Sequence, residues 1–343
     1  MPDVHVAICW TFPDHLVERL QSISPNVHVV RADELIPREH ELLNSDPDGA
    51  ERREVSAKLD ELLRDVDVLL TGGLTVDNFP SRIPNLKWIQ GIGAGMDRIL
   101  TVEGLRDEVV LTNARGMIAR PIAEWVIGAM LSFAKRMPTW AERKRAHDYN
   151  RLGLATTSVQ GKTVGILGFG NIGSEVGRIA RVLDMRVLGT KRGKSGGRGD
   201  EAHADVVYPM SETDAVIEAS DYLVIALPLT EETQQFVDRR RIGLMKSSAY
   251  LLNVGRGPIV DQSALIDALR DGKIAGAALD VFDPEPLPKD SPLWDLENVI
   301  YSPHVSGFVD DYHNRVVDLF EGNLRRYLNG EELRNIVDKE AGY

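Results

Sequence analysis

The sequence predicts an α/β protein made of two doubly wound domains. At 343 residues, the chain is longer than one hydrophobic core usually serves. Short apolar runs of strand length alternate with segments of helical periodicity along most of it. One complete strand, glycine turn, helix and second strand spans residues 163–192. Such units build doubly wound parallel sheets.

The composition is that of an ordinary globular protein, with 43% hydrophobic and 27% charged residues. A formal net charge of −12 argues against nucleic acid or an anionic membrane as the main partner. No signal-peptide pattern and no 18-residue apolar segment occurs, so we expect a cytoplasmic protein. The single cysteine, Cys9, is interpreted as a small core residue in a reducing compartment.

The first part of the chain predicts a small, largely parallel sheet. Its strands are expected at 4–9, 27–30, 66–70, 86–91 and 109–111. Helices are expected at 13–23 and over most of 35–64, where a polar cluster at 44–49 forms a surface loop. Ligands of such sheets bind at the carboxyl ends of the strands.

A long apolar helix is predicted over residues 118–136, and Pro138 ends or kinks it. Its broad apolar faces must be covered on more than one side. Burial within one chain and burial against a second subunit explain this pattern equally well.

The glycine turn at the start of the second domain has the G-x-G-x-x-G spacing typical of Rossmann dinucleotide sites. Gly168 permits the tight turn, Gly170 leaves room for a pyrophosphate, and Gly173 lets the helix approach the sheet. The complete motif is Gly168, Phe169, Gly170, Asn171, Ile172 and Gly173. The helix N-terminus that follows would face the phosphates.

The end of the next strand indicates which dinucleotide binds. NAD sites usually carry an acidic residue there, which accepts hydrogen bonds from the ribose hydroxyls. This chain has Thr190, Lys191 and Arg192, which suit a 2′-phosphate, so NADP(H) is expected to be preferred over NAD(H). The alternative is a solvated basic turn that continues into the polar loop at 193–198.

Further strands are expected at 206–208, 222–226, 249–253 and 275–281, and helices at 211–219, 238–245 and 262–270. A last helix at 311–328 is expected to return to the first domain. No spacing typical of a metal site occurs. Three segments at strand ends instead supply an arginine, carboxylates and a histidine, at 253–257, 280–286 and 302–307.

These motifs resemble those of the D-isomer-specific 2-hydroxyacid dehydrogenase family. The matching text is GFGNIG at 168–173, LPLTEET at 227–233, LLNVGRGPIVDQSAL at 251–265, ALDVFDPEP at 278–286 and SPHVSG at 302–307. The resemblance covers nearly the whole chain. It implies a Rossmann domain at residues 112–306, inserted into a smaller flavodoxin-like substrate domain made of residues 1–111 and 307–343.

The resemblance implies a catalytic set of Arg256, Glu285 and His304. The planar fork of Arg256 suits a 2-oxo acid, and lysine would be a poor replacement. His304 would donate the proton to the carbonyl oxygen, since histidine changes charge near neutral pH. Glu285 would orient the ring and favour its charged form. The remaining histidines are interpreted as structural.

The resemblance also implies binding roles. Besides the glycine motif, Thr190, Lys191 and Arg192, the expected cofactor contacts are Leu227, Pro228, Thr233, Val254, Gly255, Asp280 and His304. The expected substrate contacts are Gly73, Ala94, Gly95 and Arg256, with Gly72 and Leu74 beside them. Asp280 would face the nicotinamide carboxamide, cap backbone N–H groups, or do both. Trp10 and Phe12 are read either as an apolar wall of the pocket or as core residues.

We therefore expect an NAD(P)-dependent D-2-hydroxyacid dehydrogenase, acting as a 2-oxo acid reductase and a homodimer. Glu285 and Pro303 argue against the formate-oxidising branch of the family, and Ala94 against the phosphite-oxidising one. The alternative is a dinucleotide-sensing, corepressor-like binding protein on the same fold. Such relatives carry recruitment tails, whereas this sequence stops soon after its last predicted helix, which favours the enzyme.

Overall fold

The computed structural model describes residues 3–73, 78–150, 155–193 and 202–342. The chain forms two compact units, Met1–Met117 with Val309–Tyr343, and Ile118–Phe308. They are called unit 1 and unit 2. The pocket residue expected at Leu74 and most of the basic loop expected at 193–198 lie outside the described residues.

Unit 1 contains a five-stranded sheet in which every pairing is parallel. The strand order is β2-β1-β3-β4-β5, which is the flavodoxin-like order. The strands are β1 (Val4–Ile8), β2 (Val27–Arg31), β3 (Val68–Thr71), β4 (Trp88–Gly91) and β5 (Val110–Thr112). The helices are α1 (Asp14–Gln21), α2 (Leu35–Ser45), α3 (Ala50–Leu63), α4 (Asp97–Leu100) and α11 (Tyr312–Asn329).

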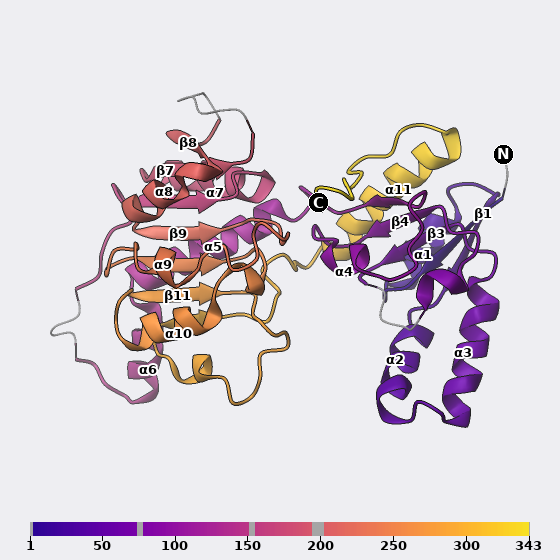
Figure 1. Ribbon diagram of the computed structural model, residues 1–343, viewed down its shortest axis with the longest axis horizontal. Helices are drawn as coiled ribbons and strands as arrows, with labels where there is room; N and C mark the ends of the chain where they lie inside the picture. The colour runs from indigo at the N-terminus through magenta and orange to yellow at the C-terminus, as the bar shows by residue number, and fades with distance from the viewer. Residues whose placement is uncertain (1–2, 74–77, 151–154, 194–201, 343) are drawn as a thin grey trace. The chain divides into compact units, whose positions relative to one another are not determined.

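The last helix, α11, belongs to unit 1, where Figure 1 shows it beside the strands of the five-stranded sheet. Buried polar contacts hold it there. The hydroxyl of Tyr312 donates to the carbonyl oxygen of Ile92 at 2.9 Å. The amide Nδ2 of Asn323 donates to Oε1 of Gln90 in β4 at 3.1 Å. The C-terminal helix is therefore bound to the sheet formed by the N-terminal part of the chain.

Unit 2 contains a seven-stranded, wholly parallel sheet. The order β12-β11-β10-β9-β6-β7-β8 is the Rossmann order with one further strand at an edge, so the predicted fold class is confirmed. The strands are β6 (Thr163–Leu167), β7 (Arg186–Lys191), β8 (Val206–Pro209), β9 (Tyr222–Ile225), β10 (Tyr250–Asn253), β11 (Gly276–Leu279) and β12 (Val299–Tyr301). The helices are α5 (Ala119–Ala134), α6 (Met137–Arg145), α7 (Asn171–Val182), α8 (Thr213–Ala219), α9 (Arg239–Ile242) and α10 (Gln262–Arg270).

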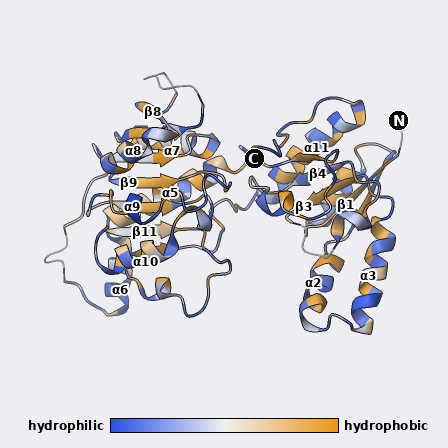
Figure 2. Cartoon of the chain, viewed as in Figure 1, coloured by the Kyte–Doolittle hydropathy of each residue, from blue (hydrophilic) through white to orange (hydrophobic). Residues whose placement is uncertain are grey.

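The central strands of unit 2 are buried at nearly every position and consist mostly of apolar residues, because both faces of the sheet are covered. In β9, Leu223 and Ile225 join the core shared with α8, α9 and α10, whereas Val224 joins the core shared with α5 and α7. Figure 2 shows the same pattern, with hydrophobic strands inside and more hydrophilic helices outside. A rigid, double-sided sheet therefore supports the loops at its carboxyl edge.

Two details differ from the sequence-based expectation. Helix α5 ends at Ala134, Arg136 adopts a left-handed conformation with φ 53°, and Pro138 lies in the first turn of α6. Proline is tolerated there because first-turn N–H groups have no helical partner. The segment at 302–307 was expected to follow a strand, but that strand was given no bounds, and the structure places it at β12. Most of the apolar residues of α5 are buried within unit 2.

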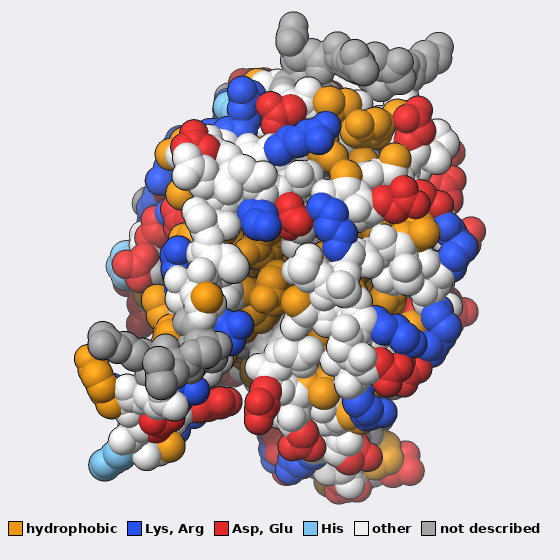
Figure 3. Space-filling view, turned by 90° about the vertical axis from the view of Figure 1, so that its left-hand side faces the viewer, with side chains coloured by type: hydrophobic (Ala, Val, Ile, Leu, Met, Phe, Trp, Pro, Cys, Tyr) orange, Lys and Arg blue, Asp and Glu red, His pale blue; other side chains and the backbone are white. Residues whose placement is uncertain are grey.

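None of the helices in the described part of the chain is long and apolar enough to cross a membrane. On the face in Figure 3, basic and acidic side chains are interspersed rather than separated by sign.

Candidate active site

The loops that carry the predicted catalytic residues meet at one edge of the unit 2 sheet. Backbone hydrogen bonds continue past the strand ends, from Val254 N–H to Ile225 O at 3.1 Å and from Asp280 N–H to Asn253 O at 3.1 Å. A further bond joins Ser302 N–H to the end of β11 at 3.0 Å. The loops after β9, β10, β11 and β12 are therefore neighbours at the carboxyl edge, where ligands of such folds bind.

The glycine turn after β6 has the geometry that its sequence predicts. Gly168 has φ +95°, a conformation that other residues rarely adopt. A Cβ atom on Gly173 would lie 2.4 Å from the carbonyl oxygen of Gly168, so only glycine lets α7 approach this closely. Phe169 N–H and Gly168 N–H donate to Thr190 O at 2.7 and 3.2 Å. The turn is thereby tied to the end of β7.

The side chains around this turn divide into buried and exposed groups. Phe169 is only 2% exposed and packs in the core, so only its backbone faces the turn. Thr190 is fully buried, whereas Lys191 and Arg192 are exposed. Nη1 of Arg192 lies 3.8 Å from Oε2 of Glu232. The two cations therefore stand at the surface, beside the loop that follows β9.

The loop after β9 is organised by the hydroxyl of Thr233. This group donates to Pro228 O at 2.7 Å and accepts from Thr230 N–H at 2.7 Å. Leu227 and Val254 are buried next to the sheet end. A Cβ atom on Gly255 would lie 2.7 Å from Leu227 O, so the two loops are in backbone contact.

Arg256 is positioned by the amide of Asn253, which is 1% exposed. Oδ1 of Asn253 accepts from Gly255 N–H at 3.1 Å, and Nδ2 donates to Arg256 O at 3.1 Å. Nη1 of Arg256 donates to Gly255 O at 2.9 Å. The side chain of Arg256 thus extends from a turn whose backbone is fixed by the amide of Asn253.

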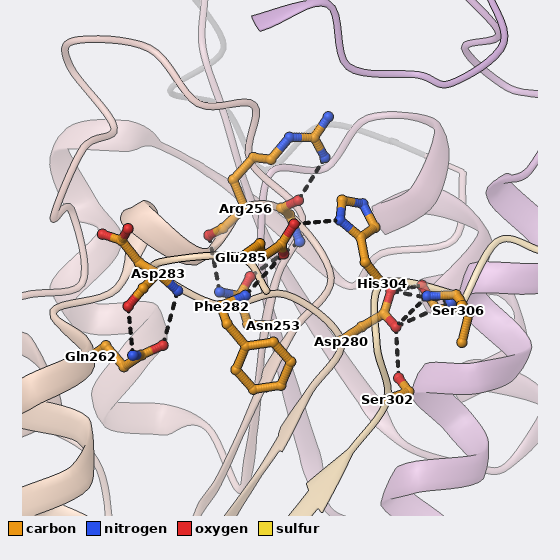
Figure 4. A network of polar contacts seen from close by, with 12 residues as sticks. Asn253, Arg256, Gln262, Asp280, Phe282, Asp283, Glu285, Ser302, His304 and Ser306 are labelled. Carbon is orange, nitrogen blue, oxygen red and sulfur yellow. Dashed lines mark hydrogen bonds and ion pairs between the residues drawn. The ribbon is translucent and has the colours of Figure 1, made fainter. Parts of the chain in front are cut away.

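His304 and Glu285 are in direct contact (Figure 4). Nδ1 of His304 lies 3.0 Å from Oε2 of Glu285, and Oε1 of Glu285 accepts from Phe282 N–H at 3.1 Å. The side chain of His304 is 46% exposed and that of Glu285 is 21% exposed. With Glu285 ionised, Nδ1 carries a hydrogen and Nε2 is left for proton exchange.

Asp280 fastens the segment that carries His304. Its carboxylate accepts from Ser302 Oγ at 2.6 Å, from Val305 N–H at 2.9 Å and from Ser306 N–H at 3.1 Å, and also from the Ser306 hydroxyl. His304 N–H donates to Asp280 O at 2.8 Å. His304 has φ 56°, so these contacts hold it in a conformation that costs about 1–3 kcal/mol. The strand-end cap is thus observed for Asp280.

The substrate residues predicted in unit 1 follow strands β3 and β4. Gly73 N–H donates to Thr71 Oγ1 at 3.1 Å, and that hydroxyl donates to Gly73 O at 2.6 Å. Ala94 O accepts from Asn113 Nδ2 at 2.8 Å, and Gly95 is exposed. The backbone of Gly73 is thus already occupied within unit 1.

The two aromatic residues after β1 lie in different environments. Phe12 is 2% exposed and is a core residue. The ring of Trp10 is only half-buried and lies against Gly72, where an added Cβ atom would come within 2.6 Å of it. Of the two, only Trp10 keeps the surface that a pocket wall needs.

Several residues that hold the site together were not singled out from the sequence. They are Asn253, Gln262, Ser302 and Ser306, whose side chains bind backbone or carboxylate groups of the catalytic loops. Asn253 gave a signal, since a polar residue that ends an apolar strand needs a buried partner. Gln262 gave none, because its partner lies 21 residues away.

Comparison with known proteins agrees with this geometry. Residues 127–306 match the model of the D-isomer specific 2-hydroxyacid dehydrogenase NAD binding domain. A glyoxylate reductase of Thermococcus gammatolerans is 34% identical over 305 residues, which is 85% of this chain and 89% of that protein.

Two solved structures are similar over their full lengths. One is a D-isomer specific 2-hydroxyacid dehydrogenase from Xanthobacter autotrophicus Py2 in complex with NADPH and MES (TM-score 0.79, 27% identity, 100% of each chain). The other is an NADPH-dependent glyoxylate/hydroxypyruvate reductase from Sinorhizobium meliloti in complex with NADP and sulfate (TM-score 0.78, 26% identity, 99% of this chain and 100% of that one).

Proposed function

The chain belongs to the D-isomer specific 2-hydroxyacid dehydrogenase family, and on that premise we propose that it reduces small 2-oxo acids with NADPH as its preferred cofactor. It is an oxidoreductase that acts on CH–OH groups and uses a nicotinamide cofactor. The observation that carries the proposal is the His304–Glu285 pair, which lies at the same sheet edge as Arg256 and the glycine turn.

His304 is proposed as the proton donor to the carbonyl oxygen. Its Nδ1 faces Glu285 at 3.0 Å, so the carboxylate fixes the orientation of the ring and leaves Nε2 for the substrate. In the direction of oxidation, the same nitrogen takes the proton back. The side chain of His304 is 46% exposed, so a ligand bound to unit 2 can reach it.

Arg256 is proposed to bind the carboxylate and the carbonyl oxygen of the substrate. A guanidinium offers five N–H groups in a fixed plane, a geometry that matches a carboxylate, and the bond from Nη1 to Gly255 O holds this plane at the turn. Arg256 would thus orient the oxo acid and stabilise the negative charge that develops on its oxygen.

The residues at the glycine turn fit a dinucleotide. The N-terminus of α7 begins at Asn171, directly after a turn at which a Cβ on Gly170 would meet nothing within 4 Å. That open space and the N–H groups of the helix end suit a pyrophosphate. The bound cofactor would supply the hydride, which passes between nicotinamide C4 and substrate C2.

The preference for NADPH is proposed from the end of β7. Lys191 and Arg192 are both exposed there, and a 2′-phosphate offers two negative charges to such a pair. The two similar solved structures are complexes with NADPH and with NADP, which supports the same choice.

A homodimer is proposed as well. Most apolar residues of α5 are covered within unit 2, but Met137 in α6 is 55% exposed and Tyr149 is 93% exposed. Met137 begins α6 and Tyr149 follows its end. Large apolar side chains exposed in this way are suited to contact with a second copy of the chain. Sedimentation velocity should give a mass near twice 38.0 kDa, whereas a monomer at micromolar concentration would refute the dimer.

The reaction is tested with purified protein, NADPH or NADH, and a panel of 2-oxo acids from glyoxylate to phenylpyruvate. We expect loss of nicotinamide absorbance with NADPH in preference to NADH. The glyoxylate reductases among the relatives support glyoxylate as the first compound to try. Consumption of neither cofactor across the panel would favour a dinucleotide-binding protein without turnover.

A further inference from the structure

Gln262 binds the backbone of the loop that carries Glu285. Nε2 of Gln262 donates to Asp283 O at 2.7 Å, and Oε1 accepts from Asp283 N–H at 3.0 Å (Figure 4). Both polar groups of one residue are thus held by one side-chain amide. A carboxylate could satisfy only the N–H group, and an alkyl side chain neither, so the pair of bonds specifies an amide.

Gln262 is held in place by a rigid helix end. Gln262 is the first residue of α10, and the preceding Asp261 caps that helix by accepting from Ala264 N–H at 2.9 Å. The helix packs on the sheet through Leu265 and Ala268, which are at most 3% exposed. Gln262 therefore projects from a fixed helix end rather than from a loop.

The bound residue, Asp283, lies in the middle of the loop between Phe282 and Glu285. Phe282 is 4% exposed, and its carbonyl oxygen would be 1.9 Å from a Cβ atom on Gly257, so the start of the loop is in backbone contact with the residue after Arg256. Asp283 itself is exposed. Gln262 thus fixes an exposed residue between a buried residue and Glu285.

The loop closes on itself through the carboxylate of Glu285. Oε1 accepts from Phe282 N–H at 3.1 Å, which leaves Oε2 for Nδ1 of His304 at 3.0 Å. A shift of the backbone at Asp283 would move both Phe282 and Glu285, which this hydrogen bond joins. The distance between the carboxylate and the imidazole therefore depends on the bonds from Gln262.

We propose that Gln262 is a positioning residue, which holds the 282–285 loop so that the carboxylate of Glu285 meets His304. Its effect on turnover rests on the function proposed above, but its effect on geometry does not. Misplacement of a reacting group by about 1 Å lowers turnover by up to about 100-fold, so a moderate loss is expected when the amide is removed.

Two substitutions separate the parts of the contact. Gln262→Leu keeps the approximate size and removes both bonds, whereas Gln262→Glu keeps only the acceptor for Asp283 N–H. Gln160→Leu is the matched control, because Gln160 is exposed and precedes β6, and its partner Asp184 precedes β7, so their contact lies at the amino ends of these strands, away from the carboxyl edge.

The kinetic test measures kcat for glyoxylate and the dissociation constant of NADPH. Gln262→Leu should lower kcat about tenfold and leave the NADPH affinity unchanged. Gln262→Glu should be intermediate and Gln160→Leu unchanged. In a Glu285→Gln background, Gln262→Leu should add little, because the group that it positions no longer carries charge.

Crystal structures of the wild type and Gln262→Leu give a result that needs no activity. The contact between Glu285 and His304 should be retained in the wild type and lost in the variant. An unchanged contact and an unchanged kcat in Gln262→Leu would overturn the proposal. A wild type that reduces no 2-oxo acid would refute the proposed function, and the two crystal structures would still decide the positioning role.

Discussion

Nδ1 of His304 lies 3.0 Å from Oε2 of Glu285, and the other oxygen of that carboxylate is bound by Phe282 N–H at 3.1 Å. The backbone bond fixes which oxygen faces the imidazole. Glu285 therefore acts on one nitrogen of His304 in a set orientation, and the opposite nitrogen is left for the substrate.

Glu285→Gln keeps the shape of the side chain and removes its charge. We expect kcat for 2-oxo acid reduction to fall about 10- to 100-fold, because a neutral amide binds the imidazole more weakly than a carboxylate and orients it less firmly. Steady-state kinetics with the best 2-oxo acid check this. Glu297 is an exposed glutamate, so Glu297→Gln is the control, and a kcat for Glu285→Gln equal to that of the control would contradict the role of Glu285.

Lys191→Ala combined with Arg192→Ala tests the basic end of β7. The dissociation constant of NADPH should rise by about 10- to 100-fold, since charge-assisted bonds to a phosphate are lost, and that of NADH should change little. Titration of protein fluorescence measures both constants. Arg186→Ala removes a cation at the other end of the same strand and should alter neither. Equal losses for NADPH and NADH would contradict the 2′-phosphate assignment.

Much of the fold could be predicted because its signals are local. The glycine turn requires φ +95° at Gly168, and the apolar runs require a sheet covered on both faces. The short edge strand β12 consists of Val299, Ile300 and Tyr301, which are half-buried or exposed, and a run of three apolar residues is too short to mark a strand by itself. Helix α5 ends at Ala134 rather than at the predicted end, Arg136, because Arg136 adopts a left-handed conformation.

The candidate site was less predictable. The motif supplied Arg256, Glu285 and His304, and the structure brings all three to one sheet edge. The residues that fix their geometry are joined by contacts between distant segments, such as the pair formed by Gln262 and Asp283. Such contacts depend on loop conformations that no short pattern specifies.

The ion pair of Arg82 and Glu39 should make a large contribution to the stability of unit 1. Nη1 of Arg82 lies 2.9 Å from Oε2 of Glu39, and the two side chains are 11% and 3% exposed. Glu39→Ala leaves a largely buried guanidinium with Asp60 as its remaining ion-pair partner among the described residues. We expect the free energy of unfolding to fall by about 3 kcal/mol.

Urea denaturation, followed by a spectroscopic signal from unit 1, measures this loss in the free energy of unfolding. Glu41→Ala is the matched control, because Glu41 lies on the same helix in an exposed pair with Arg38 and should cost under about 1 kcal/mol. Equal losses for the two variants would show that burial of the Arg82 pair contributes nothing extra.

Cys9 should be unreactive in the folded protein. Burial raises the pKa of its thiol to about 12, with a smaller contribution from the charge of Asp33. Below that pH the thiol stays protonated, and only the thiolate reacts with disulfide reagents. Labelling at pH 8 should therefore proceed only at the rate of local or global unfolding and should become rapid in urea. Rapid stoichiometric labelling of the native protein would contradict the buried position of Cys9.

The most direct test of the central claim compares NADPH oxidation by the wild type and by His304→Ala with the best 2-oxo acid. The wild type should turn over, and the variant should be slower by about two to four orders of magnitude with nearly unchanged NADPH affinity. Turnover by His304→Ala at the wild-type rate would remove His304 from the mechanism, and with it the proton donor on which the proposed reaction depends.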